Sequence, residues 1–160
     1  MAAKIVFLHA KNMEAKEENI VFHHRLPIQI RFSDVDRFGH VNNNAYFAYY
    51  DLGKQEYLSH VLGHEVFEYD VVPVVVSIKV DFFAPVHYGD DVSVETAVIH
   101  LGHKSFTLEQ QAVRTGTNEV LCRCRTVMVC VDRKNGQSVP IPELSRTKIA
   151  QFEGIEGLNY

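Results

Sequence analysis

The pattern of apolar and polar residues along the chain predicts one long helix among several β-strands. In the segment LPIQIRFS, Ile28, Ile30 and Phe32 share one parity and polar residues the other, which is typical of a half-buried strand. From about Asn43 the period becomes helical. We expect this helix to end at Gly63, because glycine is the usual residue just past a helix end.

The predicted helix carries two largely apolar stripes. Tyr46, Tyr50 and Gly53 follow one stripe, and Tyr49 and Leu52 follow the other. Two such stripes predict burial on more than one side. Glycine costs about 1 kcal/mol relative to alanine inside a helix, so Gly53 indicates a place where a sheet approaches closely.

The rest of the chain predicts four antiparallel strands in a meander, joined by turns at HYGDD, GHKS and TGTNE, and a short terminal helix at ELSRTKIAQFE. One helix cannot cover both faces of such a sheet. We therefore expect an α+β fold in which a curved antiparallel sheet wraps around the long helix, with the outer face in solvent or against another subunit. Residues 1–24 are assigned to an N-terminal extension and residues 25–160 to a single domain.

Composition narrows the possible partners. The chain has 160 residues and a formal net charge of -4, which argues against a nucleic-acid partner. No apolar stretch reaches the roughly 18 residues needed to span a bilayer, so we expect no membrane partner. The three cysteines, Cys122, Cys124 and Cys130, share one parity, which favours reduced core thiols and a cytoplasmic protein.

The polar segment SDVDRFGHVNNN connects the first strand to the long helix. The N-terminus of a helix collects unpaired backbone N–H groups and the positive end of the helix dipole, which favour a nearby carboxylate or oxyanion. Asp34 and Asp36 are the carboxylates there, and Gly39 permits a tight turn or the close approach of a ligand. One asparagine among residues 42–44 is the expected N-cap.

Other interpretations compete for this segment. A calcium loop fails, because Phe38 and Ala45 stand where oxygen ligands belong. Asp36 and His40 would make only half of a metal site, so we expect no metal. Spacing alone is equally compatible with residues that merely form a turn and cap the helix.

The stretch RFSDVDRFGHVNNNAYFAYYDLGKQEYL resembles the signature of the 4-hydroxybenzoyl-CoA thioesterase family within the hotdog-fold superfamily. The GHVNN form resembles the branch that acts on fatty or small acyl-CoA thioesters. The match extends from about residue 26 to about residue 132. The residues that carry it are Phe32, Asp34, Asp36, Gly39, Tyr46 and Tyr50.

The resemblance implies roles for residues of this segment. Asp36 would be the catalytic carboxylate, either as nucleophile or as general base. The backbone N–H of Asn43 would polarise the thioester carbonyl, and Asp34 would orient the turn. His40 would bond to substrate or to the Asp36 loop, although a structural histidine is an equal alternative, and Tyr46 would contact substrate.

A second segment, GHKSF, resembles the family's contact with the coenzyme A nucleotide. Lys104 would meet a phosphate and Ser105 would donate a hydrogen bond. An ordinary polar turn explains the same residues equally well.

The activity implied by the resemblance is hydrolysis of an acyl-CoA thioester to free acid and coenzyme A, without a cofactor beyond the CoA of the substrate. It also implies a homo-oligomer, a dimer or tetramer, with sheets joined edge to edge and active sites at the interface. The alternatives are a thioesterase for acyl carrier protein, a non-catalytic acyl-CoA binding protein and, less favoured, a hotdog dehydratase. The sequence leaves the acyl group open.

Overall fold

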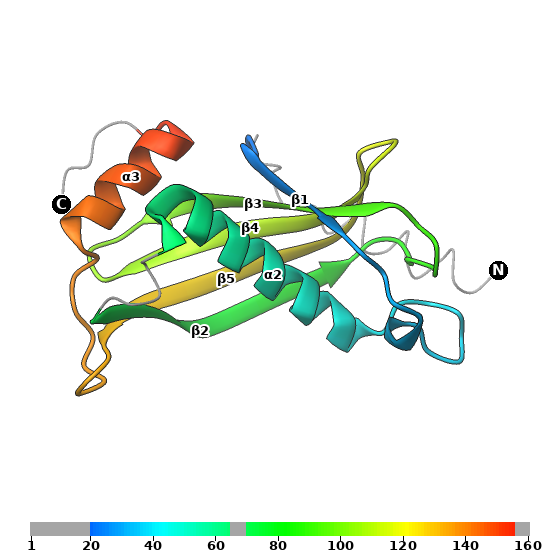
Figure 1. Ribbon diagram of the computed structural model, residues 1–160, viewed down its shortest axis with the longest axis horizontal. Helices are drawn as coiled ribbons and strands as arrows, with labels where there is room; N and C mark the ends of the chain where they lie inside the picture. The colour runs from blue at the N-terminus through cyan, green and yellow to red at the C-terminus, as the bar shows by residue number, and fades with distance from the viewer. Residues whose placement is uncertain (1–19, 65–69, 156–160) are drawn as a thin grey trace.

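A computed structural model of the chain describes residues 20–64 and 70–155, and Figure 1 shows the arrangement of its elements. In chain order they are β1 (His24–Ile28), the 3-10 turn η1 (Phe32–Asp34), α2 (Asn43–Leu62), β2 (Val71–Phe82), β3 (Val92–Leu101), β4 (Ser105–Arg114), β5 (Glu119–Asp132) and α3 (Glu143–Glu153). Of the predicted N-terminal extension, only residues 20–24 lie within the described part. No helix in that part is long and apolar enough to cross a membrane.

Five antiparallel strands form one sheet in the order β1-β3-β4-β5-β2, with α2 lying along one face (Figure 1). The parity predicted for the strands is the one that faces the helix. Val94, Leu108 and Cys122 are each fully buried on this face. The expected α+β architecture of one long helix on an antiparallel sheet is therefore confirmed.

The predicted four-strand meander is wrong at its first strand. Only β3, β4 and β5 are neighbours in sequence order, while β2 pairs with β5 and β1 occupies the free edge of β3. The connection from β2 to β3 must therefore cross the ends of β5 and β4, a distance of about 14 Å at the usual spacing of strands. Residues 83–91 make this crossing, so HYGDD belongs to a crossing segment and not to a hairpin turn.

The first strand is shorter than the alternation predicts. It ends at Ile28, and residues 32–34 form the 3-10 turn η1. The carboxylate of Asp34 accepts a hydrogen bond from the backbone N–H of Arg31 at 2.9 Å, which bends the chain back on itself. As a result Phe32, predicted to face the core, is 81% exposed.

The long helix begins and ends where its capping residues predict. The side chain of Asn42 accepts a hydrogen bond from the N–H of Asn44 at 2.9 Å, and Gly63 ends the helix with a φ of +97°. A Cβ at Gly53 would lie 2.7 Å from Cγ1 of Val94, so the sheet does approach closely there. The expectation of burial along both stripes is only partly correct, because Leu52 on the second stripe is 52% exposed.

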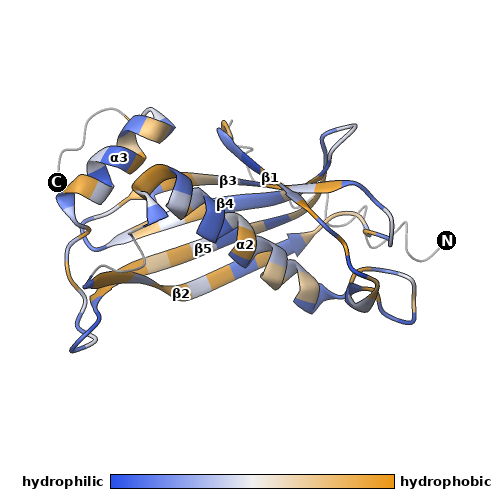
Figure 2. Cartoon of the chain, in the orientation of Figure 1, coloured by the Kyte–Doolittle hydropathy of each residue, from blue (hydrophilic) through white to orange (hydrophobic). Residues whose placement is uncertain are grey.

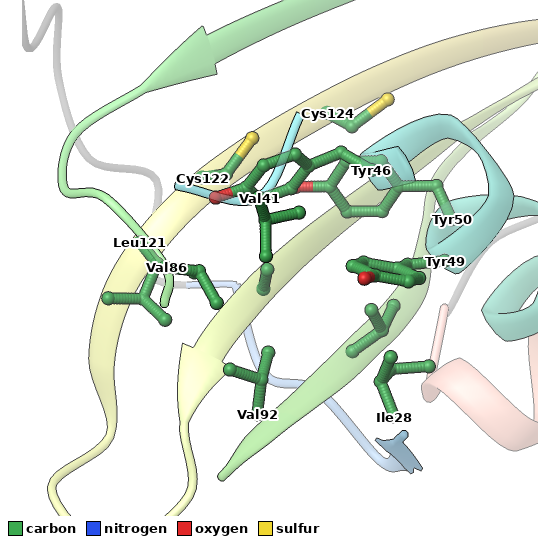
Figure 3. Close-up of a cluster of buried hydrophobic side chains, with 12 residues drawn as sticks. Ile28, Val41, Tyr46, Tyr49, Tyr50, Val86, Val92, Leu121, Cys122 and Cys124 are labelled. Atoms are coloured by element: carbon green, nitrogen blue, oxygen red, sulfur yellow. The ribbon is translucent and has the colours of Figure 1, made fainter. Parts of the chain in front are cut away.

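The core beneath the first half of α2 is aromatic and contains sulfur. Figure 3 shows Tyr46 and Tyr50 of the helix beside Cys122 and Cys124 of β5. Burial raises the pKa of the Cys122 thiol to about 12, and the three cysteines are buried and form no disulfide. They therefore serve as small core side chains, as their shared parity predicted.

The second half of α2 is joined to the C-terminal helix. Glu153 of α3 accepts hydrogen bonds from the hydroxyl of Tyr57 at 2.5 Å and from the backbone N–H of Val98 at 2.9 Å. At the other end of α3, the guanidinium of Arg146 donates to the carbonyl of Gly102 in the β3–β4 turn. These contacts fix α3 across the end of the sheet that lies far from the start of α2 (Figure 1).

Candidate functional site

The segment between η1 and α2 folds as a miniature hairpin. Val35 and Val41 form an antiparallel bridge, and the N–H of Asp36 donates to the carbonyl of His40 at 2.9 Å. At the tip, the N–H of Gly39 donates to the carbonyl of Asp36 at 3.0 Å, and Gly39 has a φ of +80° that other residues rarely adopt. The sequence therefore folds Asp36 and His40 opposite each other at the start of the helix.

Asp34 holds the base of this hairpin in place through hydrogen bonds, and orienting the turn is the role expected for it. The residue is 6% exposed, and its side chain accepts a hydrogen bond from the hydroxyl of Tyr49 at 2.7 Å in addition to the bond from Arg31. Burial alone would raise the pKa of the Asp34 carboxyl, but these hydrogen bonds and the charge of Arg31 outweigh it and hold the pKa below its usual value. Its carbonyl also accepts from the N–H of Asn42 at 2.7 Å.

Tyr49 belongs to the site although the sequence placed it only on an apolar stripe. Burial, together with the bond to Asp34, raises the pKa of its hydroxyl, which therefore remains a protonated donor at neutral pH. No local signal connects two residues so far apart in sequence. Only the folded helix brings the hydroxyl to the carboxylate.

One oxygen of the Asp36 carboxylate accepts a hydrogen bond from the chain, and the other is open to a ligand. Oδ1 accepts a hydrogen bond from the N–H of Phe38 at 2.8 Å. Among the described residues, Oδ2 accepts none. The side chain is half-buried, so one oxygen orients the group and the other is available to a substrate or a water molecule.

The N-terminus of α2, which follows the hairpin of Asp36, has a spare backbone donor. The N–H groups of Asn42, Asn44 and Ala45 are bonded to the Asp34 carbonyl, the Asn42 side chain and the Asn42 carbonyl, respectively. The N–H of Asn43 has no acceptor within the part of the chain that the structure describes. As the first residue of the helix it also has none within the helix itself.

Tyr46 lies one turn into α2 and inside the core. It is 4% exposed and its ring meets the edge of Phe82 at a centroid distance of 5.2 Å. In this arrangement it forms a wall behind the hairpin and not an open contact surface. Whether it touches substrate, as the resemblance implied, stays a prediction.

Lys104 and Ser105 do not join the other candidate residues within one chain. They lie at the β3–β4 turn, and β3 begins at the hairpin end of the sheet and runs ten residues to that turn. At about 3.3 Å per residue the separation is about 30 Å. Lys104 there donates to the carbonyl of Ser138 at 2.9 Å.

Metal ligands are not gathered in the described residues. Within 20–64 and 70–155, no three side chains of His, Cys, Asp or Glu converge in a manner that could hold an ion. Asp36 and His40 remain a pair without a third ligand.

A helix lying on an antiparallel sheet, with a carboxylate hairpin at the start of the helix, defines the class of hotdog-fold thioesterases, and comparison with known proteins agrees. The family model of the thioesterase-like superfamily matches residues 30–149. The chain belongs to this superfamily. The expected fold and family are thereby confirmed.

Individual relatives extend the comparison over most of the chain. The acyl-CoA thioester hydrolase YbgC of Escherichia coli is 26% identical over 131 residues, covering 81% of this chain and 95% of its own. Protein PA5185 of Pseudomonas aeruginosa matches with a TM-score of 0.76 and 32% identity, covering 82% of this chain and 92% of its own. A thioesterase from Thermus thermophilus, solved with coenzyme A and zinc, matches with a TM-score of 0.73 and 29% identity, covering 83% and 96%.

Proposed function

We propose that this protein hydrolyses acyl-CoA thioesters to the free acid and coenzyme A. One observation carries the proposal: Asp36 offers an oriented carboxylate with an open oxygen in the hairpin that leads into α2, and Asn43, the first residue of α2, has a spare backbone N–H. Thioester hydrolysis needs a group that attacks or activates water and a donor for the developing oxyanion. The relatives named as acyl-CoA hydrolases support the choice of thioester.

The proposed chemistry uses only groups of this chain. The thioester carbonyl accepts a hydrogen bond from the N–H of Asn43, which stabilises negative charge on that oxygen. Asp36 then either attacks the carbonyl carbon, forming an anhydride and releasing the CoA thiolate before water hydrolyses it, or takes a proton from a water molecule that attacks instead. The proposal includes no metal or organic cofactor.

The position of Lys104 supports a site shared between two copies of the chain. If two β2 strands pair antiparallel, the β3–β4 turn of one subunit comes to the hairpin end of the other. Lys104 of the partner subunit would then approach the CoA phosphates of a thioester held at Asp36.

An exposed apolar edge supports the same pairing. Strand β2 has one unpaired edge, and Figure 2 shows apolar residues along its first half. Its exposed members are Val74, Val75, Val76 and Ile78. Such an edge invites pairing with another strand.

Light scattering tests the assembly. We expect the wild type to have at least the mass of a dimer, and Val76→Lys to be monomeric and inactive, because an edge lysine disfavours strand pairing. Val21→Lys changes an equally exposed valine outside the strands and serves as the control. A wild type that is monomeric and fully active would contradict the shared site.

Replacement of Lys104 by alanine tests the nucleotide contact. We expect KM for acyl-CoA to rise about ten- to a hundredfold with little change in kcat, because a charge-assisted hydrogen bond is worth about 1.5–3 kcal/mol. Lys134→Ala, at another exposed lysine, is the control. An unchanged KM would remove the assignment of Lys104.

Release of free thiol from a panel of acyl-CoAs, short to long and aromatic, tests the activity itself. We expect turnover with at least one acyl group, and the pattern of rates identifies the preferred one. Folded wild type that cleaves none would refute the proposal. Thioesters of acyl carrier protein would then be the next substrates.

The cell compartment is also part of the proposal. Three buried cysteines without a disulfide are what a protein of the reducing cytoplasm carries, and they support that location.

A further inference from the structure

The crossing segment between β2 and β3, residues 83–91, closes over the catalytic hairpin. The N–H of Val41 donates to the carbonyl of Val86 at 2.8 Å, and Figure 3 shows these two residues side by side. The rings of His40, which precedes Val41, and His87, which follows Val86, meet edge to face, with centroids 5.1 Å apart and planes at 73°. The hairpin is therefore held by a neighbour that is remote in sequence.

The segment is itself held in place behind His87. Oδ2 of Asp90 accepts a hydrogen bond from the N–H of His87 at 2.9 Å and lies 3.7 Å from its Nδ1. Arg114 of β4 lies 3.0 Å from the same carboxylate oxygen. Burial would raise the pKa of Asp90, but the bond from His87 and the charge of Arg114 outweigh it and keep the group ionised.

We propose that His87 is a positioning residue for the reaction and acts through His40 on Asp36. The inference rests on the proposed function. His40 links the two, because its ring contacts His87 and its carbonyl accepts from the N–H of Asp36. The order of contacts runs from the ion pair of Asp90 and Arg114, through His87 and His40, to the backbone N–H of Asp36.

The exposed position of His87 distinguishes a positioning role from a contribution to the buried core. The side chain of His87 is 52% exposed, and His40 is exposed as well. Loss of the His87 ring therefore leaves the buried core intact but releases the hairpin on one side. A small displacement of a catalytic group costs rate even where it costs little stability.

The test is a double-mutant cycle with His87→Ala, His40→Ala and the double variant, assayed on the best acyl-CoA. For His87→Ala we expect kcat to fall about three- to tenfold, the equivalent of one edge-to-face ring pair, with KM little changed. The double variant should be no slower than His40→Ala, because the two residues act in series. His87→Phe retains an aromatic edge and should restore kcat to within about twofold of wild type.

Several results would overturn the inference. Independent, multiplicative losses in the double variant would show that His87 does not act through His40. A His87→Phe variant as slow as His87→Ala would show that ring contact is not what matters. His100→Ala, an exposed histidine near the far end of β3, is the control and should match wild type.

The same assay separates this inference from the proposed function. Wild type and Asp36→Asn are measured beside the cycle, with thermal unfolding of every variant to confirm folding. If turnover depends on Asp36 but is unchanged in His87→Ala, only the proposed role of His87 is overturned. A folded wild type without turnover overturns the proposed function and this role together.

Discussion

Replacing Asp36 with asparagine is expected to lower kcat for acyl-CoA hydrolysis by about a hundred- to ten-thousandfold, the usual contribution of a catalytic acid or base. Asparagine has nearly the same shape, and its amide oxygen can still accept the hydrogen bond that Phe38 donates to Oδ1. The hairpin should therefore persist. What disappears is the negative charge that both the nucleophile and the general-base mechanism require.

Steady-state kinetics and thermal unfolding, measured together, check this prediction. Asn43→Ala is the matched control, because it removes a side chain at the start of α2 but leaves the backbone N–H that would polarise the carbonyl. We expect it to lose far less activity than Asp36→Asn. If Asp36→Asn retained more than about a tenth of kcat, the carboxylate would not have the central role assigned to it.

Asp34→Asn is expected to destabilise the fold by about 2–3 kcal/mol, because the side chain is buried and receives charge-assisted hydrogen bonds. An amide oxygen in the place of Oδ2 can still accept from Tyr49 and from the backbone N–H of Arg31. The NH₂ group then takes the place of Oδ1, where it faces the guanidinium of Arg31 and the ion pair is lost. Chemical denaturation at neutral pH measures the difference. Asp51→Asn, at an exposed carboxylate of α2, should change stability by less than about 1 kcal/mol.

The pH dependence of stability gives a second signature of Asp34. Its pKa in the folded protein lies below the unfolded value, so its contribution is complete above the unfolded pKa of about 3.9 and is lost as the pH falls through the folded pKa. Wild type should therefore lose its advantage over Asp34→Asn in that acidic range. A constant difference between the two proteins down to the lowest pH would show that the charge of Asp34 does not stabilise the fold.

The features that the sequence predicted correctly are those with local causes. Asn42 and Gly63 mark the ends of α2 because capping depends on adjacent backbone groups, and alternation assigned the buried face of β3, β4 and β5. The positions of Asp36 and Asn43 also follow from one contiguous motif. The predicted length of the first strand is wrong. The strand ends at Ile28, because the hydrogen bond from Arg31 to Asp34 turns the chain although the alternation continues.

The features that the sequence missed depend on pairing between distant segments. Nothing in the residues of β2 shows that it pairs with β5 and not with β3, so the crossing of residues 83–91 was not foreseen. His87 and Asp90 both belong to HYGDD, which the sequence predicts to be an ordinary turn. Their contacts with the hairpin and with Arg114 exist only because the strand order sends the connection across the end of the sheet.

The hydrogen bonds that α3 makes through Glu153 determine how far the chain can be shortened without loss of stability. The superfamily match ends at residue 149, but Glu153 lies beyond that point and supplies the acceptor for both Tyr57 and Val98. A protein trimmed to the family boundary would leave a buried hydroxyl and a strand N–H unsatisfied, at a cost of about 1–3 kcal/mol for each. The natural limit for truncation, or for fusion to another domain, therefore lies after the last turn of α3.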